Sequence, residues 1–129
     1  MTSLFVTDSS QLPWTPHRIY PGVAGQVLVD PVTGVDLEVR LVRVEPGAEI
    51  ALHTHAASAE TFYFLCGSGE LVLGEETRPF QAGVCVHARA GAIHAVSNTG
   101  SSEVQLLAIF TPPLSPAPPG PAERAGAPR

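Results

Sequence analysis

The sequence predicts an all-β domain, folded as a sandwich or a barrel of short strands. Short runs rich in Val, Leu, Ile and Phe recur between Ile19 and Phe110, and turn signals separate them. The 13 prolines and 12 glycines of the chain are typical of such turns. No segment keeps a helical hydrophobic period over about ten residues. Regularly spaced short strands favour two packed sheets or a closed barrel.

Eight strands are expected, and their boundaries come from the turn residues between them. Asp30-Pro31 follows the first run, Pro46-Gly47 follows the second, and Thr99-Gly100 precedes the last. Each run is rich in β-branched, aromatic or other apolar residues, which pack well on a pleated surface. In chain order the strands cover residues 25–28, 35–44, 50–53, 61–65, 70–73, 83–87, 95–97 and 104–110.

The chain has 129 residues, the size of a single domain with one core. Residues 1–18, with Trp14 between Pro13 and Pro16, are expected to form an irregular N-terminal arm, and residues 19–114 to form the barrel. Residues 115–129 are rich in Pro, Ala and Gly and nearly free of large apolar side chains. They cannot bury enough surface to offset the entropy of ordering, so we expect a disordered tail.

The charge composition excludes several classes of function. The formal net charge is −5, and no basic patch is visible, so neither nucleic acid nor a membrane is an expected partner. The chain has no lysine, which excludes a lysine Schiff base and a standard P-loop. The N-terminus has no positive n-region and no long apolar run, which predicts a cytoplasmic protein.

Cys66 and Cys85 are the two cysteines of the chain. They are far apart and form no CxxC pair, which argues against a zinc finger or a thioredoxin-like site. Free cysteines are more often small buried hydrophobic residues. We therefore expect both cysteines to be buried.

The stretch HTHAASAE, residues 53–60, is a candidate metal site. Residues i and i+2 of a strand point to the same face, so His53 and His55 would present their imidazoles together. A turn through the four small residues that follow would let Glu60 begin a return strand. Two imidazoles and a carboxylate commonly bind divalent first-row metals. The alternative is an exposed strand end with ordinary polar residues.

Two longer strings include this stretch and extend the pattern. Residues 47–67 read G-x5-H-x-H-x4-E-x6-G, and residues 83–98 read G-x5-R-x-G-x2-H-x3-N. The two strings resemble, in order, the two motifs of the cupin superfamily. The second departs once, because Arg89 stands where the family usually has proline. This departure puts the shape of the turn before Gly91 in doubt and could place a cation at the mouth of the site.

The resemblance implies a cupin jelly-roll β-barrel, or double-stranded β-helix, with one divalent transition metal per chain. The ligands would be His53, His55 and Glu60 from the first motif and His94 from the second. Three imidazoles and a carboxylate suit Fe(II) best, with Mn, Ni, Zn or Cu as alternatives. The opposing interpretation is a barrel that keeps both motifs without binding a metal.

Strand parity suggests which side chains surround this centre. Phe62 and Phe64 share the face of Glu60 and would form an apolar wall of the substrate pocket. Arg40 shares a face with Glu38, and two interpretations stay open for that pair. One is an outer polar face. The other is a cavity pair whose Arg40 fork binds a carboxylate substrate.

His87 and His17 are the remaining histidines. His87 shares parity with Cys85, and both faces of its strand are apolar enough to be buried, so parity does not decide its place. It is a candidate for moving protons beside the metal, with packing outside the site as the alternative. His17 is expected at the surface.

Three classes of function remain. The first is a dioxygenase acting on a small molecule, with Glu60 as ligand and general base. The second is an isomerase, cyclase or lyase that uses the metal as a Lewis acid, with Glu60 or His87 moving the proton. The third is a module that binds a metal or small ligand without turnover. Residues 14–34 are loosely similar to cupins related to acetylacetone dioxygenase and to anti-sigma cupin domains, which favours the first class. A homodimer that covers exposed sheet edges is also expected.

Overall fold

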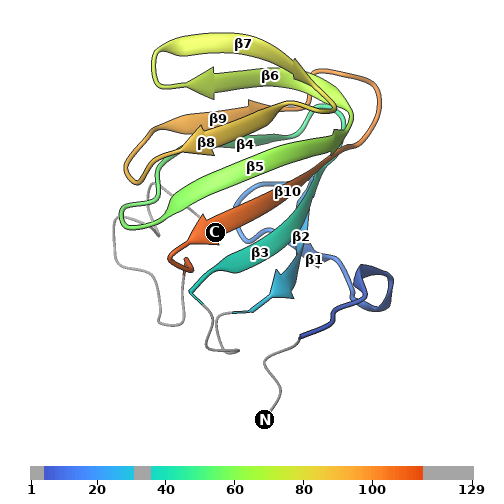
Figure 1. Cartoon of the computed structure of the whole chain (residues 1–129). Helices are drawn as coiled ribbons and strands as arrows, with labels where there is room; N and C mark the ends of the chain where they lie inside the picture. The colour runs from blue at the N-terminus through green and yellow to red at the C-terminus, as the bar shows by residue number, and fades with distance from the viewer. Residues whose placement is uncertain (1–4, 31–35, 115–129) are drawn as a thin grey trace.

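The computed structural model describes residues 5–30 and 36–114 (Figure 1). Its described part is built from strands, together with one short 3-10 helix, which confirms the predicted all-β class. The elements are η1 (Ser9–Gln11), β1 (Thr15–Pro16), β2 (Val23–Val29), β3 (Glu38–Val44), β4 (Glu49–His53), β5 (Ala59–Cys66), β6 (Ser68–Leu73), β7 (Glu76–Gln81), β8 (Cys85–Ala88), β9 (His94–Ser97) and β10 (Val104–Thr111).

The strands form two antiparallel sheets that face each other. One sheet has the order β1-β2-β3-β10-β5-β8, and the other has the order β4-β9-β6-β7. From β3 to β10, every connection except the β6–β7 hairpin crosses from one sheet to the other. This repeated crossing is the jelly-roll barrel that the resemblance to the cupin superfamily implies.

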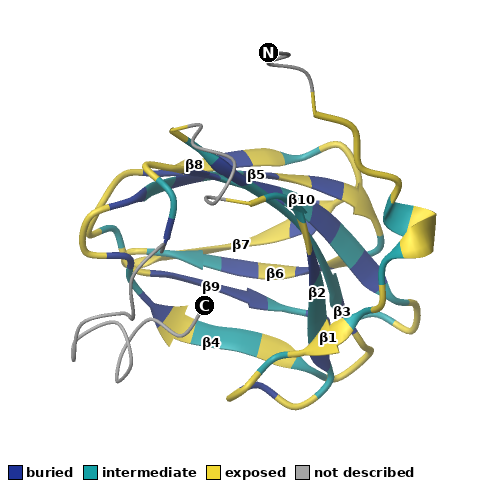
Figure 2. Cartoon of the chain, turned by 90° about the horizontal axis from the view of Figure 1, so that it is seen from below, coloured by how far each residue is buried: buried dark blue, intermediate teal, exposed yellow. Residues whose placement is uncertain are grey.

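The core fills the space between the two sheets, as the buried inner faces in Figure 2 show. Strand β10 alternates buried and partly buried residues along its length, because successive side chains point to opposite faces. Phe64 from β5 and Phe80 from β7 stack across the barrel with ring centroids 3.8 Å apart. Val44, Leu71 and Val104 are fully buried around them. One end of the barrel is therefore filled by apolar packing.

Two glycines allow the chain to cross from β5 to β6 at close quarters. Gly67 has φ of +90°, a conformation that favours glycine, and a Cβ there would lie 2.7 Å from the carbonyl oxygen of Glu103. A Cβ at Gly69 would overlap the carbonyl oxygen of Ser97 on β9. Both positions need glycine because the backbones of neighbouring segments pass too near for a side chain.

The structure differs from the sequence predictions at several elements. Strand β7 was not expected, and residues 15–16, inside the predicted irregular arm, form β1 against β2. The prediction of buried cysteines is wrong, because Cys66 and Cys85 are both exposed and unpaired. The predicted tail, residues 115–129, lies outside the described residues. Within the described ranges, no helix is long and apolar enough to cross a membrane.

Candidate metal centre

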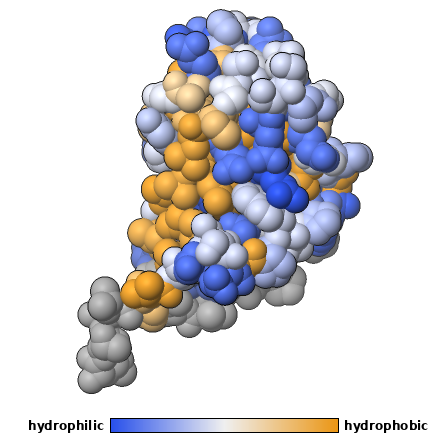
Figure 3. Space-filling view, turned by 90° about the vertical axis from the view of Figure 1, so that its right-hand side faces the viewer, coloured by the Kyte–Doolittle hydropathy of each residue, from blue (hydrophilic) through white to orange (hydrophobic). Residues whose placement is uncertain are grey.

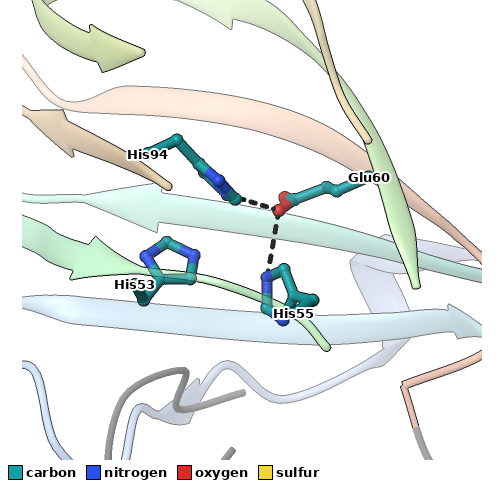
Figure 4. Close-up of side chains that lie close together, drawn as sticks. All are labelled: His53, His55, Glu60 and His94. Atoms are coloured by element: carbon teal, nitrogen blue, oxygen red, sulfur yellow. Dashed lines mark hydrogen bonds and ion pairs between the residues drawn. The ribbon is translucent and has the colours of Figure 1, made fainter. Parts of the chain in front are cut away.

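Four side chains from both sheets converge inside the barrel (Figure 4). His53 ends β4 and lies opposite His94, the first residue of the neighbouring strand β9. His55 follows β4 in a short connection, and Glu60 lies near the start of β5 in the other sheet. All four residues are buried, and one ligand atom from each lies within 4.8 Å of the others. The structure thus brings together the four residues proposed as ligands.

Backbone carbonyls hold two of the imidazoles in a fixed orientation. Nδ1 of His53 donates to the carbonyl oxygen of Ala51 at 2.8 Å, and Nδ1 of His94 donates to that of Ala92 at 3.0 Å. A carbonyl can only accept, so the proton of each ring lies on Nδ1 and Nε2 is the atom left for a ligand bond. This use of the second ring nitrogen is typical of histidines that bind metals.

His55 has two buried ring nitrogens without a hydrogen-bond partner among the described residues. Its Nε2 lies 3.2 Å from Oε1 of Glu60, an ion-pair distance, but the two groups are not aligned for a hydrogen bond. Buried polar atoms are seldom left without a partner, since their desolvation is costly. A bound cation would supply the missing partner for one of these nitrogens.

The pKa values of three of these groups are shifted by their surroundings. Burial alone would raise the pKa of Glu60, but the neighbouring His55 and His94 outweigh it and lower this pKa to about 2. Burial, together with the charge of His94, lowers the pKa of His53 to about 4. Burial is the largest single influence on the pKa of His94 and acts to lower it, but the hydrogen bond and charge of Glu60, together with the carbonyl of Ala92, outweigh burial and raise this pKa. At neutral pH Glu60 is therefore an anion and His53 is a neutral imidazole, the forms in which each binds a metal.

The donor set fits a divalent transition metal. Imidazole nitrogens and a carboxylate oxygen suit Fe, Mn, Ni, Zn and Cu. Two ligand atoms on opposite sides of an ion with bonds of about 2.1 Å lie about 4.2 Å apart. The separations here extend to 4.8 Å, so a shift of a few tenths of an ångström would close the group around one ion. The residues present fit the metal that the motifs imply.

A small apolar cavity of about 80 Å³ adjoins the four residues. Phe62 is buried in its wall and stacks on His94 with ring centroids 5.8 Å apart, as strand parity predicted. Phe64 shares that parity but does not line the cavity, because it lies deeper in the barrel against Phe80. Arg40 does line the cavity. Its neighbour Glu38 is 1 % exposed, so the interpretation of an outer polar face is wrong for this pair.

The structure does not bring His87 to the other four residues. Its side chain is exposed on β8, and its Nδ1 lies 2.8 Å from Oγ1 of Thr61. Thr61 and its register partner His87 point away from the barrel interior, since Glu60 and Ala88 beside them are buried. Arg89 is also exposed and does not line the cavity, so it adds no cation there.

Several residues that line the cavity were not anticipated from the sequence, among them His17, Phe110 and Leu114. His17 was expected at the surface, but it lines the cavity beside β2. Phe110 at the end of β10 meets His55 edge-on at 5.2 Å, and Leu114 closes the cavity beyond it. The parity of β10 could have indicated Phe110, since residues 104, 106, 108 and 110 form its buried face. No local pattern distinguishes His17 or Leu114.

Comparisons with known proteins agree with this geometry. Residues 40–110 match the family of the cupin domain. An oxalate-binding protein from Thermotoga maritima is 29% identical over 69 residues, which cover 54% of this chain and 57% of that relative, less than two thirds of its length.

Solved structures show the same fold. The crystal structure of a predicted oxalate decarboxylase from Thermotoga maritima has a TM-score of 0.74 and 24% identity, covering 84% of this chain and 98% of that one. The structure of the polyketide cyclase RemF from Streptomyces resistomycificus has a TM-score of 0.75 and 18% identity, and the match covers 84% of this chain and 79% of that one. The family match spans more than half of the chain. The barrel and its buried group of three histidines and one glutamate agree with this match. The chain therefore belongs to the cupin domain family.

Proposed function

We propose that this cupin is a metal-dependent enzyme that oxidises a small organic molecule in the barrel cavity, with a dioxygenase-type reaction. The observation that carries the proposal is the buried group of three imidazoles and one carboxylate beside an apolar cavity. A bound Fe(II), the favoured metal, would supply the redox chemistry and leave ligand positions for a substrate and dioxygen.

The residues of the chain would bind, shield and orient the substrate. Phe62 and Phe110 would limit access of water to the centre, since both are buried in the cavity wall. Glu60 would act first as a ligand. Its low pKa keeps it ionised at neutral pH, so its free carboxylate oxygen could also accept a proton from a bound substrate.

A second candidate reaction is non-redox: a cyclisation, isomerisation or decarboxylation with the metal as a Lewis acid. The structural likeness to a polyketide cyclase and a predicted oxalate decarboxylase favours it. A third candidate, binding without turnover, draws support from the oxalate-binding relative.

Oxygen uptake separates the candidates. The protein is loaded anaerobically with Fe(II) or Mn(II) and screened against small ketones and carboxylic acids with an oxygen electrode and mass spectrometry. Oxygen consumed in step with loss of a compound supports the oxygenase. Conversion of a compound without oxygen consumption contradicts it in favour of the second reaction. Binding without conversion of any compound favours the third.

We also propose that two copies form a homodimer through the outer face of the six-stranded sheet. Tyr63 and Leu65 on β5 are 44% and 47% exposed, and Leu107 on β10 lies between Tyr63 and Leu41 of β3 in the register. Hydrophobic residues gather in a band on the face of the molecule in Figure 3. Exposed apolar patches commonly mark interfaces. A monomeric mass by light scattering at micromolar concentration would contradict the dimer.

A cytoplasmic location is proposed as well. Cys66 and Cys85 are both exposed thiols without a disulfide. Exposed free thiols persist in a reducing compartment, whereas they tend to oxidise outside the cell. Fractionation of cells that express a tagged chain tests the location, and recovery outside the cytoplasm would contradict it.

A further inference from the structure

Arg40 lies where two cavities meet. The inner cavity of about 80 Å³ adjoins the metal-ligand group, and an outer cavity of about 420 Å³ lies against the N-terminal segment at Pro13 and Pro16. Arg40, His17 and Gly25 line both cavities. Arg40 therefore borders both the space beside the metal-ligand group and the outer cavity.

Glu38 holds the Arg40 guanidinium in place. Glu38 is 1 % exposed and uses both of its carboxylate oxygens. One accepts from Nε of Arg40, and the other accepts from the backbone N–H of Leu114 at 3.0 Å. Among the residues that the structure describes, Arg40 makes no hydrogen bond through its two terminal nitrogens. Those nitrogens form a planar fork, and such forks bind a carboxylate through two parallel hydrogen bonds.

The charges around the two cavities favour an anion. Arg18 and Arg40 are the arginines among the described lining residues, and Glu60 is the one lining carboxylate, although the chain as a whole carries a net charge of −5. Glu38 offsets Arg40, and Glu60 offsets half the charge of a divalent ion. One positive charge would remain at the ion, in the same inner cavity that Arg40 lines. A buried charge is costly unless it is paired, so the group that completes the site would be negative.

We propose that the substrate is a small carboxylic acid, whose carboxylate binds the Arg40 fork while its reactive carbon faces the metal-ligand group. The proposal rests on the proposed metal-dependent function and names its substrate class. The inner cavity has room for roughly five to eight water-sized atoms, which suits an acid of about three or four carbons. The apolar lining around Phe62 and Val42 suits its carbon chain.

Pyruvate and pyruvamide test the proposal, because they have nearly the same shape and differ in charge. Calorimetric titration of each probe into the metal-loaded protein should show pyruvate bound about tenfold or more tightly, since a charge-assisted pair with arginine is lost with the amide. Arg40→Gln should reduce this preference to about twofold or less. Arg43→Gln is the matched control: Arg43 lies three residues along the same strand on the opposite face, 4.5 Å from the Trp14 ring. It should keep the preference of the wild type.

Arg40→Gln leaves Glu38 as a buried charge without its partner, which destabilises a fold. The Glu38→Gln, Arg40→Gln double variant replaces the ion pair by two neutral amides. It leaves no unpaired buried charge, so the same titrations can be made if the single variant does not fold. Equal affinity of the wild type for the two probes contradicts the proposal without any variant. A preference for pyruvate that persists in a folded Arg40→Gln protein or in the double variant also contradicts it.

Metal content, measured on the same samples with and without added Fe(II), separates this proposal from the proposed function. A protein that binds metal and does not distinguish pyruvate from pyruvamide contradicts the carboxylate site alone. A protein that prefers pyruvate through Arg40 and binds no metal supports the carboxylate site and contradicts the metal-dependent function.

Discussion

Nε2 of His94 lies 3.0 Å from Oε1 of Glu60, although 34 residues separate the two in the chain. The contact joins β9 of one sheet to β5 of the other inside the barrel. Nδ1 of His94 donates to Ala92, so a proton on Nε2 is needed for a hydrogen bond to the Glu60 carboxylate. When both ring nitrogens of His94 carry a proton, the proton on Nε2 occupies the position where a metal ion would bind.

Metal affinity should therefore depend on pH. Glu60 raises the pKa of His94, and a metal ion must displace the proton that His94 holds. Affinity is expected to fall as the pH drops through this raised pKa, with about one proton released per ion bound below it. Titration calorimetry in buffers of different ionisation enthalpy measures the released protons. An affinity that is the same at pH 5.5 and pH 8, with no proton release, would contradict this arrangement.

The stability of the metal-free protein should fall between pH 6.5 and pH 4. Because the pKa of His53 is lowered to about 4, the unfolded chain takes up this proton first as the pH drops, and the folded state is penalised. The expected loss is about 3 kcal/mol. The raised pKa of His94 makes the stability depend on pH only above pH 6.5, so it does not offset the loss between pH 6.5 and pH 4. Urea unfolding from pH 7 to pH 4 measures it.

Two variants serve as controls for that pH dependence. His53→Gln should flatten the dependence between pH 6.5 and pH 4, because it removes the buried titrating group. His87→Gln alters an exposed histidine and should leave the curve of the wild type unchanged. A slope that survives in His53→Gln would show that another group is responsible.

Gly69→Ala should destabilise the barrel strongly, whereas Gly25→Ala should have little effect. The Cβ at position 69 would overlap a backbone carbonyl on β9, which can move only by breaking the pairing of β6 with β9. We expect a cost of about 1–3 kcal/mol or more. A Cβ at position 25 would make an ordinary contact of 3.5 Å with the carbonyl oxygen of Leu41. Thermal unfolding of both variants tests the difference, and equal midpoints would contradict it.

Phe62 and Phe64 should differ in what they support, although they lie two residues apart on one face. Phe64→Ala is expected to lower the free energy of unfolding by about 3–5 kcal/mol, because it leaves a void beside Phe80, and to keep the metal content. Phe62→Ala also costs stability, but it opens the cavity wall beside His94 and should weaken small-molecule binding. Calorimetry with one ligand on both variants separates the roles. An equal loss of ligand affinity would contradict them.

The apolar runs, the turn signals between them and the alternation of side chains along a strand predicted most of the barrel. Strand β7 shows where these signals fail. Its sequence ETRPFQ includes charged residues and Pro79, and five of its six residues are exposed. Proline and polar residues are tolerated because β7 lies at the edge of its sheet, where one side of the backbone needs no partner. Only the tertiary position of β7 makes this sequence a strand, so local preference could not indicate it.

The candidate site divides in the same way. The four candidate ligands follow from the resemblance to the two cupin motifs, which implies the same four positions that the structure brings together. The place of Arg40 does not, because the alternation of β3 is the same whether Glu38 and Arg40 face solvent or the cavity. Glu38 accepts a hydrogen bond from the backbone N–H of Leu114, which lies 76 residues later in the chain. Arg40 borders the cavity only because these distant segments pack together in the folded barrel. A contact between segments so far apart in the chain cannot be predicted from the local sequence.

Metal content tests the central claim most directly. Purified wild type, reconstituted with Fe(II) or Mn(II) and freed of loose ions, is measured by plasma mass spectrometry beside a His53→Ala, His94→Ala double variant and a His87→Ala control. About one ion per chain in the wild type and the control, with almost none in a folded double variant, is the predicted result. A folded wild type that retains no metal, or a double variant that retains as much, would contradict a metal centre at these residues.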